Sequence, residues 1–202
     1  MTAQTRSGFT VLTFGDRSAP RSLAELPALR VGEAADIDGA AAAARRLLVL
    51  GSDADLAAVL SRLMRQDALD VEVAQVRGRL SARRALSGTA RRVPLIRDDT
   101  GTALVGAAQW LPPSGAAAIR GEAVVDDAVL FDGEVPGVRI EPTPQLPGLR
   151  ATVLGGRRRW VTGRAAQLGT TGALVLRDGV IGTREVKRST FYRHTTGWLR
   201  VG

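Results

Sequence analysis

The hydrophobic pattern of residues 1–90 alternates between short apolar runs and stretches with helical spacing. Residues 47–50, LLVL, form a continuous apolar run that predicts a buried central strand. Apolar residues at positions 56, 59, 60 and 63 recur every three or four positions, so they predict a helix with one buried face. Residues 71–76, VEVAQV, alternate between apolar and polar positions and predict the next strand.

Three weaker patterns precede the central strand. Residues 9–14 are rich in aromatic and β-branched types and predict a first strand, and residues 29–31 predict a short one. Residues 34–45 contain an unbroken alanine run and favour a helix. Strands and helices that alternate at these spacings form a parallel sheet with right-handed crossover connections. The first part of the chain is therefore expected to be an α/β domain.

The pattern changes near residue 93, where short apolar segments separated by Gly, Pro and Asp replace the helical spacing. Asp99-Thr100-Gly101 lies between two such segments and predicts a hairpin. No helical pattern follows residue 92, except near Ala116. We expect an α/β plus β protein, with an N-terminal parallel-sheet α/β domain over 1–90 and an antiparallel, β-sandwich-like domain over 91–202 that includes the C-terminal strand pair.

The turn that follows the central strand is the first candidate site. Gly51 ends the strand, and Asp53 or Asp55 is expected to cap the helix that follows. A strand, a glycine turn and a helix N-terminus together form a common phosphate site. Two aspartates in the turn would repel a bare phosphate, so a metal-bridged phosphate or a hydroxyl group suits this turn better.

Residues 77–92, RGRLSARRALSGTARR, form the most basic segment, with six arginines and no acidic residue. Leu80, Ala82 and Leu86 have the spacing of a short helix. The plainer interpretation is a solvated basic surface loop. The alternative is a phosphate clamp, in which Arg77 and Arg79 add to the site at residues 51–55.

Composition excludes several kinds of site. The 202-residue chain has no cysteine, which excludes disulfides and thiolate metal sites, and its single histidine excludes a multi-histidine metal site. The net charge of +8 comes almost entirely from arginine, since Lys187 is the only lysine. An Arg, Ala and Gly bias is typical of GC-rich coding, and the charge is spread evenly along the chain. It therefore does not by itself indicate nucleic-acid binding.

Localisation is predicted from the length of the apolar runs and from the composition of the N-terminal segment. None reaches the roughly 18–20 residues of a membrane span. Residues 1–15 lack the apolar core of a signal peptide, so we expect a cytoplasmic protein. The sequence predicts no oligomeric state.

The order of domains and the turn at 51–55 resemble the diacylglycerol kinase, sphingosine kinase and NAD kinase superfamily. That family has a strand followed by Gly-Gly-Asp-Gly-Thr and a helix with Asn-Glu-Val near its start. Here Gly51, Asp53 and Val59 match, whereas Ser52 and Ala54 replace two glycines. Ala57 and Ala58 replace the family's Asn and Glu.

Two further family motifs are altered. The second glycine-rich phosphate loop, Gly-Thr-Gly-Asn-Asp-Phe-Ala, is replaced by VRGRLSARRAL at 76–86. The Asp-Gly-Glu that bacterial lipid kinases carry near the C-terminus is Asp178-Gly179-Val180, and an Asp-Gly-Glu occurs earlier, at 132–134. Side chains at Ser52 and Ala54 stand where glycine lets the backbone approach a phosphate closely. The resemblance therefore implies a degenerate member of the family.

The resemblance implies that a nucleotide or phosphorylated ligand binds in a cleft between the two halves, with weak or no kinase activity. Gly51, Ser52, Asp53, Ala54, Asp55, Arg77 and Arg79 would contact it. ATP and Mg²⁺ would be cofactors if the protein is active; the sequence assigns neither a catalytic residue nor a protein metal site. The alternative is a non-enzymatic interaction domain whose Arg-rich surfaces bind nucleic acid or acidic partners.

Other polar groupings favour structural roles. Asp98-Asp99 and Asp126-Asp127 are expected to form turns rather than a metal or acid–base pair. Arg157–Arg159, beside Trp160, are interpreted as a basic turn rather than a phosphate or base contact. His194 has no visible acidic partner and is expected to be structural.

Overall fold

The computed structural model describes residues 7–202 and divides into two compact units. The first unit runs up to Val93 and also takes in Gly197–Gly202, while the second is Pro94–Thr196. The chain therefore passes between the units twice. The first unit contains all the helices of the described chain, and 94–196 contains strands and turns only. The predicted α/β plus β fold class is confirmed.

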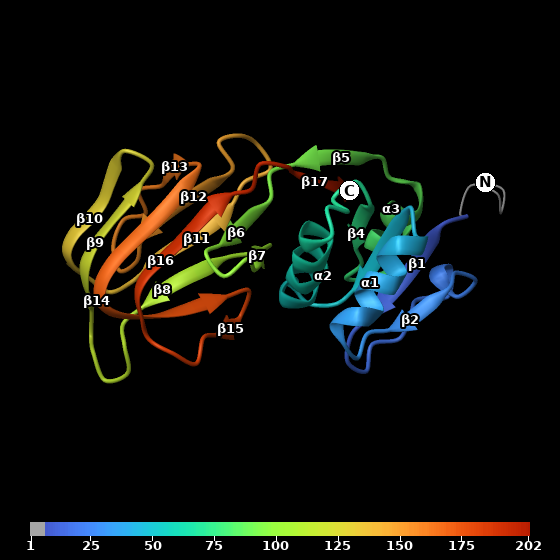
Figure 1. Ribbon diagram of the computed structural model, residues 1–202, viewed down its shortest axis with the longest axis horizontal. Helices are drawn as coiled ribbons and strands as arrows, with labels where there is room; N and C mark the ends of the chain where they lie inside the picture. The colour runs from blue at the N-terminus through green and yellow to red at the C-terminus, as the bar shows by residue number, and fades with distance from the viewer. Residues whose placement is uncertain (1–6) are drawn as a thin grey trace. The chain divides into compact units, whose positions relative to one another are not determined.

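The first unit is built on one mixed sheet (Figure 1). Its strand order is β2-β1-β3-β4-β17-β5. Neighbours from β2 to β17 pair in parallel, and only β5 runs antiparallel to β17. The strands are β1 (Phe9–Thr13), β2 (Ala28–Arg30), β3 (Arg46–Leu50), β4 (Glu72–Gln75), β5 (Ala90–Val93) and β17 (Trp198–Val201).

The predicted central strand is β3, which is buried along its whole length between β1 and β4. Helix α2 (Asp53–Arg65) follows it and buries Leu56, Val59, Leu60 and Leu63, as the helical spacing predicts. Helix α1 (Ala34–Ala43) packs beside α2, and Arg62 on α2 donates to Asp38 on α1. This hydrogen bond lowers the pKa of the Asp38 carboxyl.

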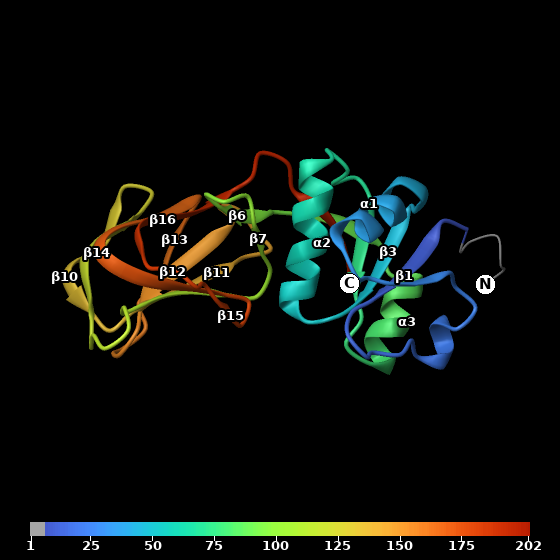
Figure 2. The same ribbon diagram turned by 60° about the horizontal axis from the view of Figure 1, so that its bottom comes forward.

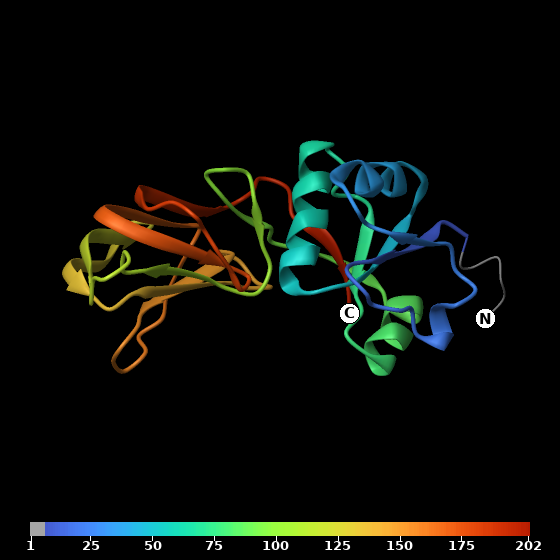
Figure 3. The ribbon, with the colours of Figure 1, turned by 90° about the horizontal axis from the view of Figure 1, so that it is seen from below.

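The other face of the first sheet is covered by α3 (Arg79–Ser87) and the short 3₁₀ helix η2 (Arg21–Leu23), which contact one another. Figures 2 and 3 show α3 on the side of the sheet opposite α1 and α2. The interpretation of 77–92 as a surface loop is therefore wrong. Ala82 and Ala85 give the segment a small apolar face that packs into the core with Leu23, although Leu80 points to solvent.

The second unit is an antiparallel sheet that closes around one hydrophobic core. Its longest strand, β14, pairs with β9 through residues 166–170 and with β8 through residues 174–177. A register shift between Gly169 and Ala173 separates these two halves of the strand. Such an irregularity bends a strand, so one half of β14 can pair with β9 and the other half with β8 around the same core. That core contains Trp110 and Phe191. Those two rings have centroids 6.2 Å apart.

The strands of the second unit are short apart from β14. Their bounds are β6 (Ile96–Asp98), β7 (Ala103–Leu104), β8 (Ala108–Leu111), β9 (Ile119–Val125), β10 (Ala128–Val135), β11 (Val138–Pro142), β12 (Leu149–Val153), β13 (Val161–Gly163), β14 (Ala165–Arg177), β15 (Val180–Ile181) and β16 (Val186–Arg193). The hairpin predicted at Asp99-Thr100-Gly101 joins β6 to β7. The chain near Ala116 forms turns instead of a helix.

The last strand differs from its predicted placement. The sequence analysis assigned it to the second domain, whereas β17 pairs with β4 and β5 of the first sheet. Gly197 permits this return, because a Cβ there would lie 2.3 Å from the carbonyl oxygen of Val93. No helix in the described part of the chain is long and apolar enough to cross a membrane.

Candidate functional site

A cleft of about 600 Å³ lies in the first unit, at the carboxyl ends of parallel strands. Three loops form it, one after β1, one after β3 and one after β4. The residues that line it are Arg17, Ser18, Pro20, Leu50, Gly51, Ser52, Asp53, Val76, Arg77 and Gly78. This edge of an open α/β sheet is where ligands of such folds generally bind.

Gly51 leaves the strand at a point with no room for a side chain. A Cβ there would lie 2.6 Å from the Cβ of Asp55 and 2.8 Å from its Oδ2. The space is taken by the first turn of α2, which folds back on residue 51. Glycine is therefore required here by close packing, and any larger residue would displace the start of α2.

Ser52 is the N-cap residue of α2, and Asp55, one of the two aspartates expected to cap the helix, completes a capping box with it, whereas Asp53 does not cap the helix. The Ser52 hydroxyl accepts from the Asp55 backbone N–H at 3.2 Å. The Asp55 carboxylate accepts from the Ser52 backbone N–H at 2.7 Å and from its hydroxyl at 2.8 Å. This reciprocal pair is a capping box, and it stabilises the start of the helix.

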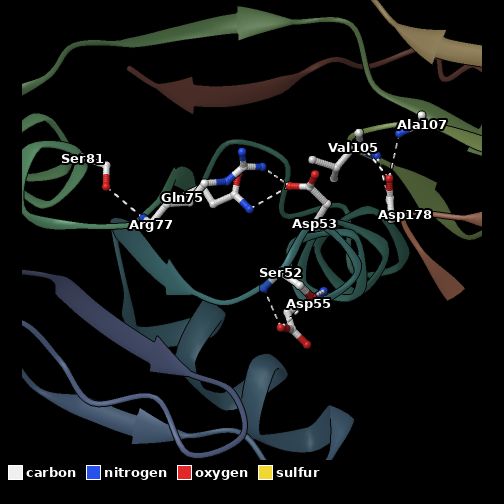
Figure 4. A network of polar contacts seen from close by, with 10 residues as sticks. Ser52, Asp53, Asp55, Gln75, Arg77, Ser81, Val105, Ala107 and Asp178 are labelled. Carbon is white, nitrogen blue, oxygen red and sulfur yellow. Dashed lines mark hydrogen bonds and ion pairs between the residues drawn. The ribbon is translucent and has the colours of Figure 1, made fainter.

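Asp53 holds the loop after β4 instead of capping the helix. Its carboxylate accepts from the Gln75 side-chain amide at 2.9 Å and from the Arg77 guanidinium (Figure 4). Asp55 in turn lies 3.6 Å from Arg17, in the loop after β1. Each aspartate of the turn thus has a different arginine beside it, so the two negative charges that would repel a phosphate are balanced.

The start of α3 forms the remaining side of the cleft. The Ser81 hydroxyl accepts from the backbone N–H groups of Arg77 and Gly78, each at 2.9 Å. These bonds fix the backbone of the loop that carries the Arg77 side chain. Gly78 has an extended backbone and open space beside its Cα, so neither its conformation nor its surroundings demand glycine.

The predicted site residues separate into two groups. Gly51, Ser52, Asp53 and Arg77 line the cleft, whereas Ala54, Asp55 and Arg79 do not. The sequence analysis missed Arg17, Ser18 and Pro20. They follow the first predicted strand, and the expectation that this strand is parallel to the central one could have placed their loop at the same edge of the sheet.

The candidate residues of the second unit serve turns and loops. The Asp178 carboxylate accepts from the backbone N–H groups of Val105, Gly106 and Ala107 at 2.7–3.1 Å, two of which Figure 4 shows. Asp126 has a positive φ at the start of the β9–β10 hairpin, and its carboxylate accepts from the N–H groups of Arg164 and Ala165. Asp126 therefore forms a turn, as expected.

His194 has a local backbone partner, and Arg157–Arg159 lie on the surface of the second unit. The ring Nδ1 of His194 lies 3.1–3.2 Å from the backbone oxygen and nitrogen of Thr196. Arg157–Arg159 lie exposed in the connection between β12 and β13. Within residues 7–202, no group of three or more His, Cys, Asp or Glu side chains is arranged to hold a metal ion.

Replacing Asp55 with alanine is expected to lower stability by about 0.5–2 kcal/mol, because the capping box loses its reciprocal partner. Thermal unfolding of the purified variant measures this. Asp53→Ala is the matched control, since Asp53 takes no part in the capping box. Its partly exposed ion pair with Arg77 and its hydrogen bond from Gln75 are expected to contribute about 0–1 kcal/mol. An equal or larger loss for Asp53→Ala would contradict the assignment of the cap.

Comparison with known proteins identifies the fold. No protein-family model matches the sequence, and no curated protein sequence matches it either. Solved structures do match over 96% of this chain. A putative diacylglycerol kinase from Bacillus anthracis str. Sterne aligns with a TM-score of 0.74 and 10% identity over 97% of its own chain.

Two nucleotide complexes have the same fold. An NAD kinase from Archaeoglobus fulgidus in complex with ATP aligns with a TM-score of 0.66 and 12% identity over 93% of its chain. Yeast NADH kinase complexed with NADH aligns with a TM-score of 0.62 and 10% identity over 83% of its chain. At these identities the likeness establishes the fold, so the resemblance inferred from the sequence is confirmed at that level.

Proposed function

We propose that this protein binds a nucleotide or another phosphorylated small molecule in the cleft of its first unit, with weak or no kinase activity. The observation that carries the proposal is the pair of arginines, Arg17 and Arg77, in a cleft at the carboxyl edge of the parallel strands. Arginine binds phosphate through several N–H groups of fixed geometry. Two structures with this fold are described as complexes with ATP and with NADH.

The start of α2 supplies further groups for an anion. Ser52 and Asp53 line the cleft at the start of the helix, where the backbone N–H groups of Asp53 and Ala54 are not used by the capping box. The helix dipole adds a partial positive charge at the same end. A phosphate bound beside Ser52 would lie near these N–H groups and near both guanidinium groups.

Three features favour weak or absent phosphoryl transfer. Ser52 and Ala54 carry side chains where the family has glycines. The Asp53 carboxylate, the match to the family's central aspartate, is occupied by Gln75 and Arg77. Asp178 is similarly occupied by three backbone N–H groups. Among the described residues that line the cleft, Asp53 alone is acidic, so these residues do not fit a protein-bound Mg²⁺ ion.

Replacing Arg77 with alanine is expected to weaken nucleotide binding at least tenfold. The phosphate would lose a charge-assisted hydrogen bond of about 1.5–3 kcal/mol, and Asp53 would be left without its cation. Titration calorimetry with ATP and with NADH, each with and without Mg²⁺, measures the change. Arg83→Ala is the matched control, because Arg83 is an exposed arginine of the same segment that does not line the cleft.

Two results would contradict the proposal. Equal affinity of the Arg77→Ala and wild-type proteins would remove the cleft from the binding site. Robust ATP-dependent turnover of a lipid or NAD by the wild type, abolished in Asp53→Asn, would show that Asp53 serves catalysis despite its partners.

A further inference from the structure

The outer face of α3 is basic along its whole length. Residues spaced at about 100° around a helix share one face when they differ by three or four positions. The residues exposed on α3 lie within one arc and include no acid: Arg79, Leu80, Arg83, Arg84 and Ser87. Ala82 and Ala85, on the opposite side, are buried against the sheet.

The three arginines of this face have no partner within residues 7–202. Neither a hydrogen bond nor an ion pair joins the side chain of Arg79, Arg83 or Arg84 to another described residue. Elsewhere in the first unit Arg46 and Arg62 each pair with a carboxylate, whereas the exposed Arg65 and Arg91 do not pair with any described one. What distinguishes α3 is that three such arginines share one helix face with no acidic residue on it. An unpartnered basic helix face fits a negatively charged partner.

Leu80 lies in the middle of the arginines and is 74% exposed, the largest exposed fraction among the exposed large apolar side chains of the described chain. On a nucleic acid, the phosphate backbone would meet the arginines but offer no apolar surface to Leu80. The headgroup region of an anionic bilayer offers both, since phosphates lie above the acyl chains. A helix with basic residues around an apolar one therefore suits a lipid interface.

Helix α3 is held in place by contacts with the core and with Arg46, so the position of its outer face is fixed relative to the sheet. Ala82 and Ala85 pack into the core, and the Arg46 side chain donates to the carbonyls of Ala85 and Gly88 at 2.7 and 3.0 Å. The neighbouring η2 contacts α3 and carries Arg21, which is also exposed, with Glu25 just beyond it. The charges of Arg21 and Glu25 offset each other, so the basic surface on this side of the sheet is the outer face of α3 itself.

We propose that the outer face of α3 docks onto anionic lipid surfaces, with Arg79, Arg83 and Arg84 contacting lipid phosphates and Leu80 entering the acyl boundary. The attachment is peripheral and reversible. It is independent of the nucleotide proposal, because neither Leu80, Arg83 nor Arg84 lines the cleft.

Vesicle co-sedimentation tests the docking. The full-length protein is mixed with vesicles of phosphatidylcholine alone, or with about one quarter phosphatidylglycerol, at low salt. We expect binding to the anionic vesicles only. Replacing Arg79, Arg83 and Arg84 together with glutamine is expected to lower the partition coefficient on the order of a hundredfold, from roughly fivefold per arginine. Leu80→Ala is expected to lower it roughly tenfold.

The matched control removes the same charge elsewhere. The second unit has three exposed arginines that are consecutive in the sequence, Arg157, Arg158 and Arg159. Replacing these three with glutamine gives the same net charge as the α3 triple variant. This control variant is expected to bind anionic vesicles like the wild type. Melting temperatures of all variants confirm that loss of binding is not loss of folding.

Three outcomes would overturn the proposal. The first is no binding of wild type to anionic vesicles. The second is an equal loss for the two triple variants, which would mean that only net charge matters. The third is unchanged vesicle binding in Leu80→Ala together with tighter, salt-sensitive binding to a DNA or RNA duplex, which would make nucleic acid the partner of this face.

Discussion

Replacing Arg46 with alanine is expected to destabilise the first unit by about 3–5 kcal/mol, the usual loss when one member of a buried ion pair is removed. Arg46 is only 5% exposed. Its Nε donates to Glu72 at 2.5 Å, and its Nη atoms donate to the carbonyls of Ala85 and Gly88. The side chain thus ties β3 to β4 and to the end of α3. Denaturant unfolding followed by circular dichroism measures the loss.

Arg45 provides the control for this prediction. It precedes Arg46 in the chain and contacts the same Glu72 at 3.3 Å, but its side chain is 52% exposed. Arg45→Ala is expected to lower stability by at most about 1 kcal/mol. Arg46→Lys should recover little of the loss, because an ammonium group lacks the planar set of donors that reaches three acceptors. Similar losses for Arg45→Ala and Arg46→Ala would contradict the assigned role.

Replacing Asp98 with alanine is expected to cost the second unit about 3–5 kcal/mol of stability for a related reason. Asp98 is fully buried. One carboxylate oxygen accepts from the backbone N–H groups of Thr100 and Thr102, and the other accepts from Arg177. The variant would leave a largely buried guanidinium and two turn donors without their acceptor. Unfolding of the purified variant, followed by circular dichroism, measures the change.

Asp99 is the matched control, since it is adjacent to Asp98 and exposed. Asp99→Ala is expected to change stability by no more than about 0.5 kcal/mol. Asp98→Asn keeps the turn acceptors but removes the charge that pairs with Arg177, so an intermediate loss is expected. If Asp98→Ala melted like the wild type, the buried pair would not contribute to the stability of this unit.

The pattern of apolar, polar and turn-forming residues along the chain was sufficient to predict most of the helices and strands. The apolar run at 47–50 became β3, and the helical spacing over 56–63 became the buried face of α2, because both patterns depend only on neighbours along the chain. The change to short segments with turn residues after 93 likewise predicted the antiparallel unit. The turn at 51–55 was placed at a strand–helix junction, where Gly51, Ser52 and Asp53 line the cleft.

Only the tertiary structure decided which of two like residues is buried and what each charged group meets. Arg45 and Arg46 are the same residue type at adjacent positions, and so are Asp98 and Asp99. The side-chain partners of the buried residues Arg46 and Asp98 lie up to 79 positions away in the chain. Arg17 reaches the cleft because β1 lies beside β3, and β17 joins the first sheet because it fits between β4 and β5. Strand order and ion-pair partners are set by contacts distant in sequence, so local periodicity and propensity carry no information about them.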